Sequence, residues 1–376
     1  MSIAEQRTNE QIIGRADVND LEAILSVSNS DADSHESIVK NNADTIFTWE
    51  YERGKIPGLV KLYEKAKTGQ WNASTDIDWS IEVDQEAGVM LTPEANAMMR
   101  DYDVVGTPVE KWGDKEWLQF EIESQNWTLS QFLHGEQGAL LTTAKITETV
   151  PWIDAKYYAA TQVYDEARHV EVFARYLDEK LDGHYPVNAH LKLLLDDIIA
   201  DSRWDMTYLG MQVMVEGLAL AAFGFIRQIT TEPLLKQILR YVMSDEARHV
   251  AFGVLSLQEY YKELTDKEIF DRQEFAYEAG VRMRDRFLQQ EVWERMGVPV
   301  KETLEMVTKS AGRDMFQQML FAKIVPNVKK LGLLDRNDSW LRRRYEEMGV
   351  IQFEDWVDTG EEFESFALDA TEAEAV

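Results

Sequence analysis

The sequence contains no cysteine among its 376 residues. Disulfide bonds, thiolate metal sites and cysteine nucleophiles are therefore excluded. No run approaches roughly eighteen consecutive apolar residues, so no transmembrane helix is expected. The first residues, MSIAEQRTNE, lack the basic and apolar regions of a secretion signal. These absences predict a cytoplasmic protein that is not inserted in a membrane.

Positive charge is scarce: 39 Lys and Arg residues stand against 68 Asp and Glu residues, for a formal net charge of −29. Nucleic acids and anionic membranes are bound by basic surfaces, so neither is expected as a partner. An acidic surface mainly keeps a protein soluble. The alternative is that it docks a basic partner, such as an electron-transfer protein.

The composition divides the chain into a helical centre and more polar ends. Residues up to about 40 are polar and predict a mobile arm with one short helix. Apolar residues recur at helical spacing in 43–72, around a break at Pro57 and Gly58. We expect an N-terminal arm with accessory helices (1–112), a helical bundle (113–265), C-terminal accessory helices (266–354) and a disordered acidic tail (355–376).

The helical centre is interrupted at few, well-marked places. Pro151 ends the first long helical pattern, and Thr231 is a candidate cap for the fourth helix. Strand-like alternation is scarce. The sequence therefore predicts an all-α fold in which four long helices joined by short loops form a bundle, followed by two more helices. The predicted breaks lie at 151, 182–188, 230–233, 266 and 298–299.

A short motif occurs twice in the centre. The sequence YDEARHV at 164–170 is repeated as SDEARHV at 244–250, an offset of 246 − 166 = 80 residues. The repeat predicts two related helix hairpins that face each other.

Each copy of the motif holds a Glu-x-x-His pair, Glu166 with His169 and Glu246 with His249. Residues three apart on an α-helix are separated by a rise of about 4.5 Å and lie on one face. A carboxylate and an imidazole directed at one point form half of a metal site. A single such pair is more often a solvated ion pair, but the identical repeat favours metal. A dinuclear bundle site then needs one further glutamate from each of the other two helices.

The positions of these two glutamates follow from the predicted hairpins. Antiparallel helices bring residues to the same height when they are equally far from the turn. Residue 151 lies midway between 136 and 166, and residue 231 midway between 216 and 246; both partners are glutamates, Glu136 and Glu216. Each lies among mainly apolar neighbours, where a carboxylate is costly unless it is paired or bound to metal. The flanking Gly135 and Gly217 would allow close approach of helices.

Four carboxylates and two imidazoles suit first-row metals. We expect two iron ions, with a manganese–iron pair as an open alternative, because ligand types alone do not separate them; zinc fits less well. The remaining histidines are not expected to be ligands. They are His35, His134, His184 and His190.

With these motifs, residues 113–265 resemble the ferritin-like di-iron carboxylate proteins. The Asp-Glu-x-Arg-His form, and GEQGALL around Glu136, are similar to the hydroxylase components of soluble methane, toluene and phenol monooxygenases. The resemblance implies a ferritin-like four-helix bundle with additional helices at both ends. It also implies six metal ligands: Glu136, Glu166, His169, Glu216, Glu246 and His249.

The resemblance further implies roles for residues beside the ligands. Asp165 and Asp245 would accept hydrogen bonds from the ligand histidines and orient them. Arg168 and Arg248 would lie in an ion-pair network beneath the site; the alternative is that they form surface salt bridges. The run LYEKAKTGQWNASTDIDW (62–79) is similar to amino-terminal segments of some of these oxygenases.

The chain departs at three positions from the patterns of families in the superfamily that it resembles. Leu220 stands where those monooxygenases usually have threonine, so proton delivery would differ. Phe173 stands where small subunits of ribonucleotide reductase have a radical tyrosine. Val242 stands where related amine N-oxygenases often add a histidine.

These patterns predict an oxidoreductase: a di-iron monooxygenase or oxidase that uses dioxygen to hydroxylate, N-oxygenate or desaturate a small apolar substrate. The alternatives are an iron-storage or peroxide-scavenging protein and a radical-generating subunit. A ferredoxin or a reductase is expected as electron donor, and a homodimer as the assembly. Candidate substrate-pocket residues are Phe132, Leu133, Leu140, Thr143, Phe173, Leu220 and Phe223.

Overall fold

A computed structural model describes residues 12, 15, 17–27, 38–41, 43–87, 102–181 and 183–359. These residues form helices and connecting segments and contain no β-strand, so the predicted all-α fold is confirmed. The prediction of a disordered acidic tail lies largely outside the described residues. Its first part is ordered, since Thr359 is buried and its backbone N–H donates to Asn327 Oδ1.

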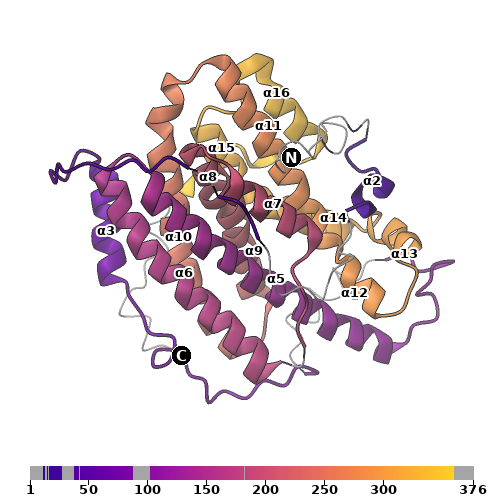
Figure 1. Ribbon diagram of the computed structural model, residues 1–376. Helices are drawn as coiled ribbons and strands as arrows, with labels where there is room; N and C mark the ends of the chain where they lie inside the picture. The colour runs from indigo at the N-terminus through magenta and orange to yellow at the C-terminus, as the bar shows by residue number, and fades with distance from the viewer. Residues whose placement is uncertain are drawn as a thin grey trace.

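Four long helical segments form the bundle, and Figure 1 shows how they are arranged. Helix α5 packs against α6, and α9 packs against α10, so the bundle consists of two helix hairpins. The hairpin loops span 150–152 and 230–232, centred on the predicted turn positions 151 and 231. The bundle segments are α5 (Asp114–Thr149), α6 (Ile153–Lys180), the continuous run α8 (Trp204–Tyr208), η1 (Leu209–Val215) and α9 (Glu216–Ile229), and α10 (Pro233–Glu263).

Proline sets both hairpin turns. Val150 precedes Pro151 and is extended (φ −64°, ψ 137°), because the residue before proline avoids the helical region. Helix α10 begins with Pro233 at its first turn, where no N–H is needed. The Glu232 carboxylate accepts hydrogen bonds from the N–H groups of Leu234 and Leu235. The helix cap is therefore Glu232, and the prediction of Thr231 was wrong.

The third predicted long helix is divided. Helix α7 (Ala189–Ala200) ends before 201–203, and α8 starts at Trp204. The Asp201 carboxylate accepts the N–H of Arg203 at 2.8 Å, a local bond that competes with the helix. The buried Lys145 ammonium donates to the carbonyl of Ile199 at 2.7 Å and also to that of Asp201. This side chain satisfies carbonyls that the helix end leaves open.

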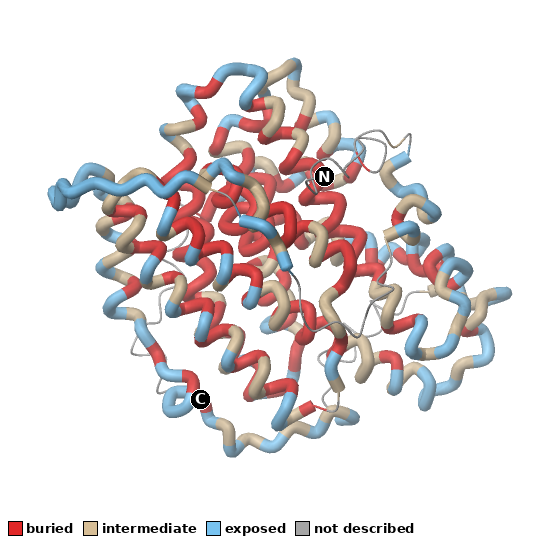
Figure 2. The backbone as a smooth tube through the Cα atoms, in the orientation of Figure 1, coloured by how far each residue is buried: buried red, intermediate tan, exposed pale blue. Residues whose placement is uncertain are grey.

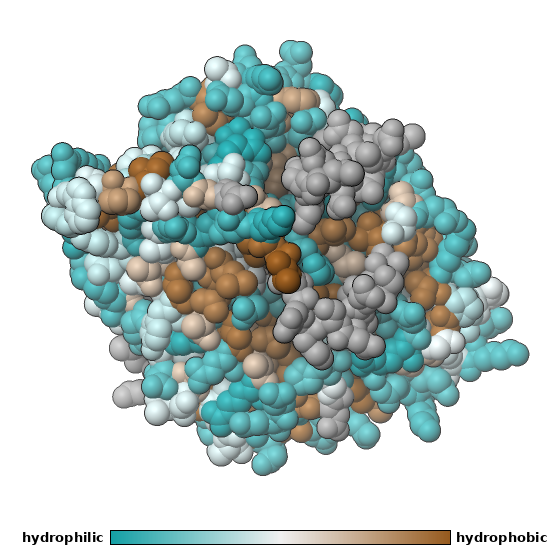
Figure 3. Space-filling model, in the orientation of Figure 1, coloured by the Kyte–Doolittle hydropathy of each residue, from teal (hydrophilic) through white to brown (hydrophobic). Residues whose placement is uncertain are grey.

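The segment Trp204–Ile229 is long and apolar enough to cross a membrane by length and composition, which the sequence analysis did not expect. Its most apolar window is 78% buried inside the protein. A helix that is apolar all round is typical of a protein core as well as of a membrane. Figure 2 shows the buried positions concentrated in the central helices. Figure 3 shows a mostly hydrophilic face, with hydrophobic residues gathered near its middle.

More helices surround the bundle than the two predicted after it. Helix α3 packs on both α6 and α10, and the segment that follows α3 is thereby brought beneath the bundle centre. The surrounding elements are α2 (Leu21–Leu25), α3 (Pro57–Thr68), α11 (Asp266–Asp285), η2 (Arg286–Leu288), α12 (Gln290–Arg295), α13 (Val300–Val307), α14 (Ala311–Met319), η3 (Leu320–Lys323), α15 (Val325–Lys330), α16 (Arg336–Glu347) and η4 (Ile351–Phe353).

Candidate metal centre

The six predicted ligands converge in the middle of the bundle. Their carboxylate and imidazole atoms fall into two groups, and within each group the atoms lie within 4.8 Å of one another. Glu166 belongs to both groups, so it lies between two possible ion positions. All six side chains are buried, the most exposed being Glu136 at 5%. The groups are Glu136, Glu166, His169 and Glu246, and Glu166, Glu216 and His249.

Each imidazole directs its Nδ1 atom at the carboxylates. His169 Nδ1 lies 3.2 Å from Glu136 Oε2 and 3.1 Å from Glu246 Oε1. His249 Nδ1 lies 3.1 Å from Glu166 Oε1 and 3.6 Å from Glu246 Oε2. The two oxygens of Glu246 therefore face different imidazoles, so this carboxylate would help to hold the metal ions.

The opposite nitrogen of each imidazole faces an aspartate from the other hairpin. His169 Nε2 lies 3.2 Å from Asp245 Oδ2, and His249 Nε2 lies 3.4 Å from Asp165 Oδ2. An Nε2–H that donates to aspartate leaves Nδ1 free to accept a metal ion. The two copies of the motif thus orient each other's histidine.

Two arginines neutralise these aspartates. Arg168 Nη2 lies 2.5 Å from Asp165 Oδ1 and 3.0 Å from Asp245 Oδ2. Arg248 pairs with Asp245, and its Nη1 donates to the Ser244 carbonyl at 2.8 Å. The arginine side chains are 4% and 5% exposed, so the network is internal and not a set of surface salt bridges. Burial alone would raise the pKa of Asp245, but Arg248 and His169 hold it well below its usual range.

Two residues beneath the site were missed by the sequence analysis. The Trp71 indole N–H donates to Asp245 Oδ2 at 2.7 Å, and Gln70 donates to Asp165 Oδ1 at 3.2 Å. Arg168 donates in turn to the Trp71 carbonyl at 2.9 Å. Both residues lie in the run 62–79 that resembles oxygenase segments, which was the available signal.

Gln162 was also missed. It lies one turn before Glu166 on α6, is fully buried, and its amide donates at 2.9 Å to both Glu166 Oε1 and Glu216 Oε1. It therefore links carboxylates of the two hairpins. The repeat gave no hint, because the equivalent position in the second copy is Val242.

A π-helical segment precedes one ligand. Residues of η1 (Leu209–Val215) take π-helical turns directly before Glu216. Such bulges occur frequently at functional sites. The bulge brings η1 close to α10: a Cβ atom on Gly253 would lie only 2.6 Å from Gln212 Cβ. Glycine at this position permits the approach.

The buried ligand atoms fit a cationic group. Several have no hydrogen-bond partner in the part of the chain that the structure describes: Glu166 Oε2, Glu216 Oε2, both oxygens of Glu246, and His249 Nδ1. Burial and the neighbouring Glu246 raise the pKa of Glu136 well above its ordinary value, and burial and Glu166 do the same for Glu216. Buried unpaired acceptors are unfavourable, whereas metal ions would satisfy them. The donor set suits iron or manganese.

A small cavity adjoins the carboxylates. Of the predicted pocket residues, only Phe132 and Phe223 line it. Phe173 packs behind them, with ring centroids 6.0 and 5.8 Å away. On α5 the cavity is lined by residues at positions 132, 135 and 139. The face of α5 that lines the cavity is therefore rotated relative to the face predicted from positions 133, 140 and 143. The predicted residues that do not line it are Leu133, Leu140, Thr143, Phe173 and Leu220; the additional ones are Gln131, Gly135, Ala139, Val215, Ala219 and Arg286.

Three of the other four histidines lie away from the candidate ligands, and the fourth is not among the described residues. His134 contacts the Tyr185 carbonyl at 2.8 Å, and His184 lies 2.8 Å from Asp178. His190 is buried near Gln290. His35 lies outside the described residues.

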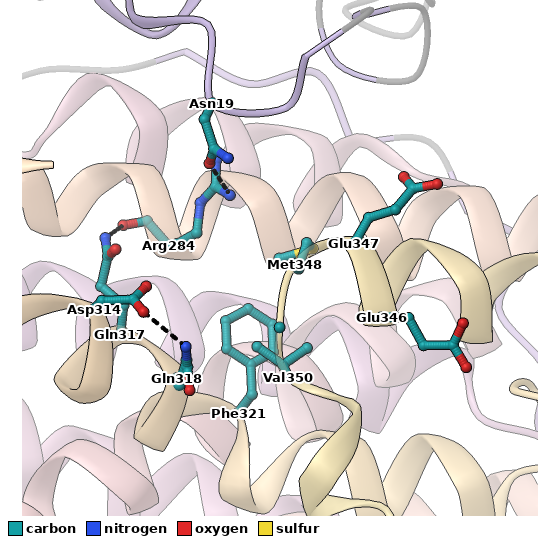
Figure 4. Close-up of a pocket in the computed structure, with 11 residues that line it drawn as sticks. Asn19, Arg284, Asp314, Gln317, Gln318, Phe321, Glu346, Glu347, Met348 and Val350 are labelled. Atoms are coloured by element: carbon teal, nitrogen blue, oxygen red, sulfur yellow. Dashed lines mark hydrogen bonds between the residues drawn. The ribbon is translucent and has the colours of Figure 1, made fainter. Parts of the chain in front are cut away.

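A larger pocket of about 270 Å³ lies between α11, α14 and α16, away from the metal centre (Figure 4). Its polar side chains largely bond one another: Arg284 donates to Asn19, and Gln318 donates to Asp314. Among its described lining residues no cluster of metal-ligand type occurs.

The substitution Asp165→Asn should weaken metal binding without abolishing it. An amide cannot match the charge of the carboxylate that faces His249 Nε2, and loss of such a partner typically lowers affinity or activity about 10–100-fold. Metal titration of the purified variant measures this. If the Asp165→Asn variant lost its metal as completely as a variant lacking one of the six ligands, the assigned role of Asp165 would be contradicted.

Comparison with known proteins gives matches among solved structures alone: no family model and no curated protein matches the sequence. The structural matches include R2-like ligand-binding oxidases. A single-residue variant with an anaerobically reconstituted Mn/Fe cofactor has 20% sequence identity and a TM-score of 0.44, covering 72% of this chain and 92% of that one. A form with an aerobically reconstituted metal cofactor, studied after photoconversion, has 18% identity and a TM-score of 0.45, with the same coverage.

Proposed function

We propose that this protein is an oxidoreductase that holds two metal ions, di-iron or manganese–iron, and uses dioxygen to oxidise a small organic substrate. One observation carries the proposal: two Glu-x-x-His pairs and two further glutamates converge in a buried cluster with unpartnered ligand atoms, next to a cavity with aromatic walls. The finer assignment is a monooxygenase or an oxidase.

The six residues would hold the ions, with Glu166 and Glu246 placed between the imidazoles. When bound, such a metal pair supplies redox chemistry with dioxygen that no side chain here can provide. The protein residues position and shield it. Asp165 and Asp245 orient the imidazoles, and Phe132 and Phe223 exclude water from the cavity side.

The radical-subunit alternative has less support. Phe173 stands at the expected tyrosine position and is fully buried against Phe132 and Phe223. A phenyl ring has no phenolic proton to lose. We also propose that electrons come from a ferredoxin or a reductase and that the protein is a cytoplasmic homodimer; the acidic composition supports docking of a basic donor.

Exposure to excess iron tests the proposal. The reduced, metal-loaded protein should consume dioxygen and retain about two ions per chain, by the six-ligand count of such bundles. Iron(II) is added in large excess under air, and dioxygen consumption and protein-bound iron are followed together. Continued uptake far beyond two ions per chain would establish storage, and a long-lived tyrosyl radical in electron paramagnetic resonance would establish the radical subunit.

A further inference from the structure

A buried arginine next to the candidate metal centre has no polar partner among the described residues. Arg286 begins η2, directly after α11, and is 3% exposed. Its side chain forms no hydrogen bond or ion pair with any described residue, and its Nε atom is buried without a partner. Its guanidinium carbon lies 4.7 Å from the centroid of the adjacent Phe287 ring.

The neighbouring Arg284 shows that this isolation is specific. Arg284 Nε donates to Asp285 Oδ1 at 2.9 Å, Nη1 donates to Asn19 Oδ1 at 3.0 Å, and Nη2 donates to the Val18 carbonyl at 2.9 Å. Figure 4 shows the bond to Asn19. Two residues later on the same segment, Arg286 has none of these.

A buried guanidinium without a counter-ion is unfavourable. Burial lowers the pKa of Arg286 to about 9, so the group is still positively charged at neutral pH. The positively charged guanidinium of Arg286 is therefore suited to binding an anionic ligand.

Arg286 faces the cavity at the metal centre. The same cavity is lined by the ligands Glu136, Glu216 and Glu246 and by the rings of Phe132 and Phe223. Its volume of about 20 Å³ holds about one water molecule, so the lining must move to admit a substrate. Gly135 and Ala219 are only half-buried and mark its outer rim, and a Cβ atom on Gly135 would meet nothing within 4 Å.

The backbone around Arg286 is held in place from α5. Gln289, at the end of η2, is left-handed (φ 54°, ψ 44°), which is unfavourable for a residue other than glycine. Its side chain is tied to α5: Oε1 accepts from Ser124 Oγ at 2.8 Å, and Nε2 donates to Thr128 Oγ1 at 3.3 Å. Strained backbone of this kind persists where the surroundings determine it, often at functional sites.

We propose that Arg286 binds the carboxylate of the substrate, so that the substrate class is a small organic acid with an apolar body. The guanidinium presents paired N–H donors that match a carboxylate, and the apolar body would lie against Phe132 and Phe223. The inference rests on the proposed function, because it takes this cavity to be the substrate site.

Matched acids and amides test the inference. Binding of benzoate and hexanoate, and of the uncharged benzamide and hexanamide, is measured by calorimetry on anaerobic iron(II)-loaded protein. We expect at least one acid to bind roughly 10-fold or more tightly than its amide, as for a charge-assisted hydrogen bond. Arg286→Met should lower the affinity for that acid about 10–100-fold and leave amide binding within a few-fold. Equal affinities of acid and amide, or no binding of either acid, would overturn the inference.

Control variants separate binding from folding and from direct metal ligation. Arg313 is also buried with an unpartnered nitrogen but does not line the cavity, so Arg313→Met should leave acid binding unchanged. If Arg286→Met does not fold, Arg286→Lys is used in its place. Lysine keeps the positive charge, so this variant should retain part of the preference for the acid over the amide. Unchanged acid affinity in a folded Arg286 variant would show that the acid binds the metals alone and would refute the role of Arg286.

The same samples distinguish this inference from the proposed function. Iron content and dioxygen consumption are measured on each. Acid binding that is independent of Arg286, in protein that holds iron and consumes dioxygen, would overturn only the inference. Arg286-dependent acid binding in protein that holds neither iron nor manganese would overturn the proposed function and leave Arg286 as an acid-binding residue.

Discussion

The Glu246→Ala protein should lose most of its metal, falling from about two ions per chain to well below one, since such bundles use six ligands for two ions. Glu246 has the largest expected effect because its two oxygens face different imidazoles, His169 at 3.1 Å and His249 at 3.6 Å. Neither oxygen has a hydrogen-bond partner within the described structure. Removal of this side chain takes away a carboxylate that faces both imidazoles. Elemental analysis of protein produced in cells supplied with ample iron and manganese measures the loss of metal.

The matched control for this experiment is Glu259→Ala on the same helix. Glu259 is exposed, pairs with Lys262 at 2.6 Å, and belongs to neither group of candidate ligands. Its removal should leave metal content unchanged. Full metal content in the folded Glu246→Ala protein would refute the dinuclear site described here.

Arg168→Met should destabilise the metal-free protein by about 3–5 kcal/mol, the range for removing one partner of a buried ion pair. Arg168 bonds two aspartates, the Gln70 side chain and the Trp71 carbonyl, and is almost fully buried. Methionine fills a similar volume but leaves Asp165 without this charge partner. The free energy of unfolding, measured by chemical denaturation, reports the change.

Arg175→Met on the same helix is the control for that measurement. Arg175 pairs with Glu179 at 2.8 Å, and the two side chains are 31% and 48% exposed. Surface pairs of this kind contribute about 0–1 kcal/mol. If both variants lost the same small amount of stability, the network beneath the site would not be the strong structural element proposed here.

The convergence of the six candidate ligands was predictable because it follows from local geometry. Helical periodicity places Glu166 and His169 on one face, and a short turn at Pro151 brings Glu136 to the same height. The repeat at an offset of 80 residues applies the same geometry to the second hairpin. The structure brings all six side chains together, and the turns are centred where they were predicted.

The breaks in the helices were less predictable. The gap between α7 and α8 depends on Asp201 and on Lys145, which reaches across from α5 to bind the carbonyls at the end of α7. The π-helical turns of η1 likewise lie in close contact with α10. Neither feature leaves a periodic signal in the residues concerned, because both involve neighbours distant in sequence.

The sequence alone established the all-α fold, the two hairpins and the six candidate ligands, since helix period and turn position are local properties of the chain. The tertiary structure alone decided which side chains surround those ligands. Trp71 reaches Asp245 from 174 residues away, and Arg286 reaches the cavity from a segment outside the bundle. Contacts of this kind depend on how separate helices pack, and packing depends on the shapes and volumes of many side chains at once.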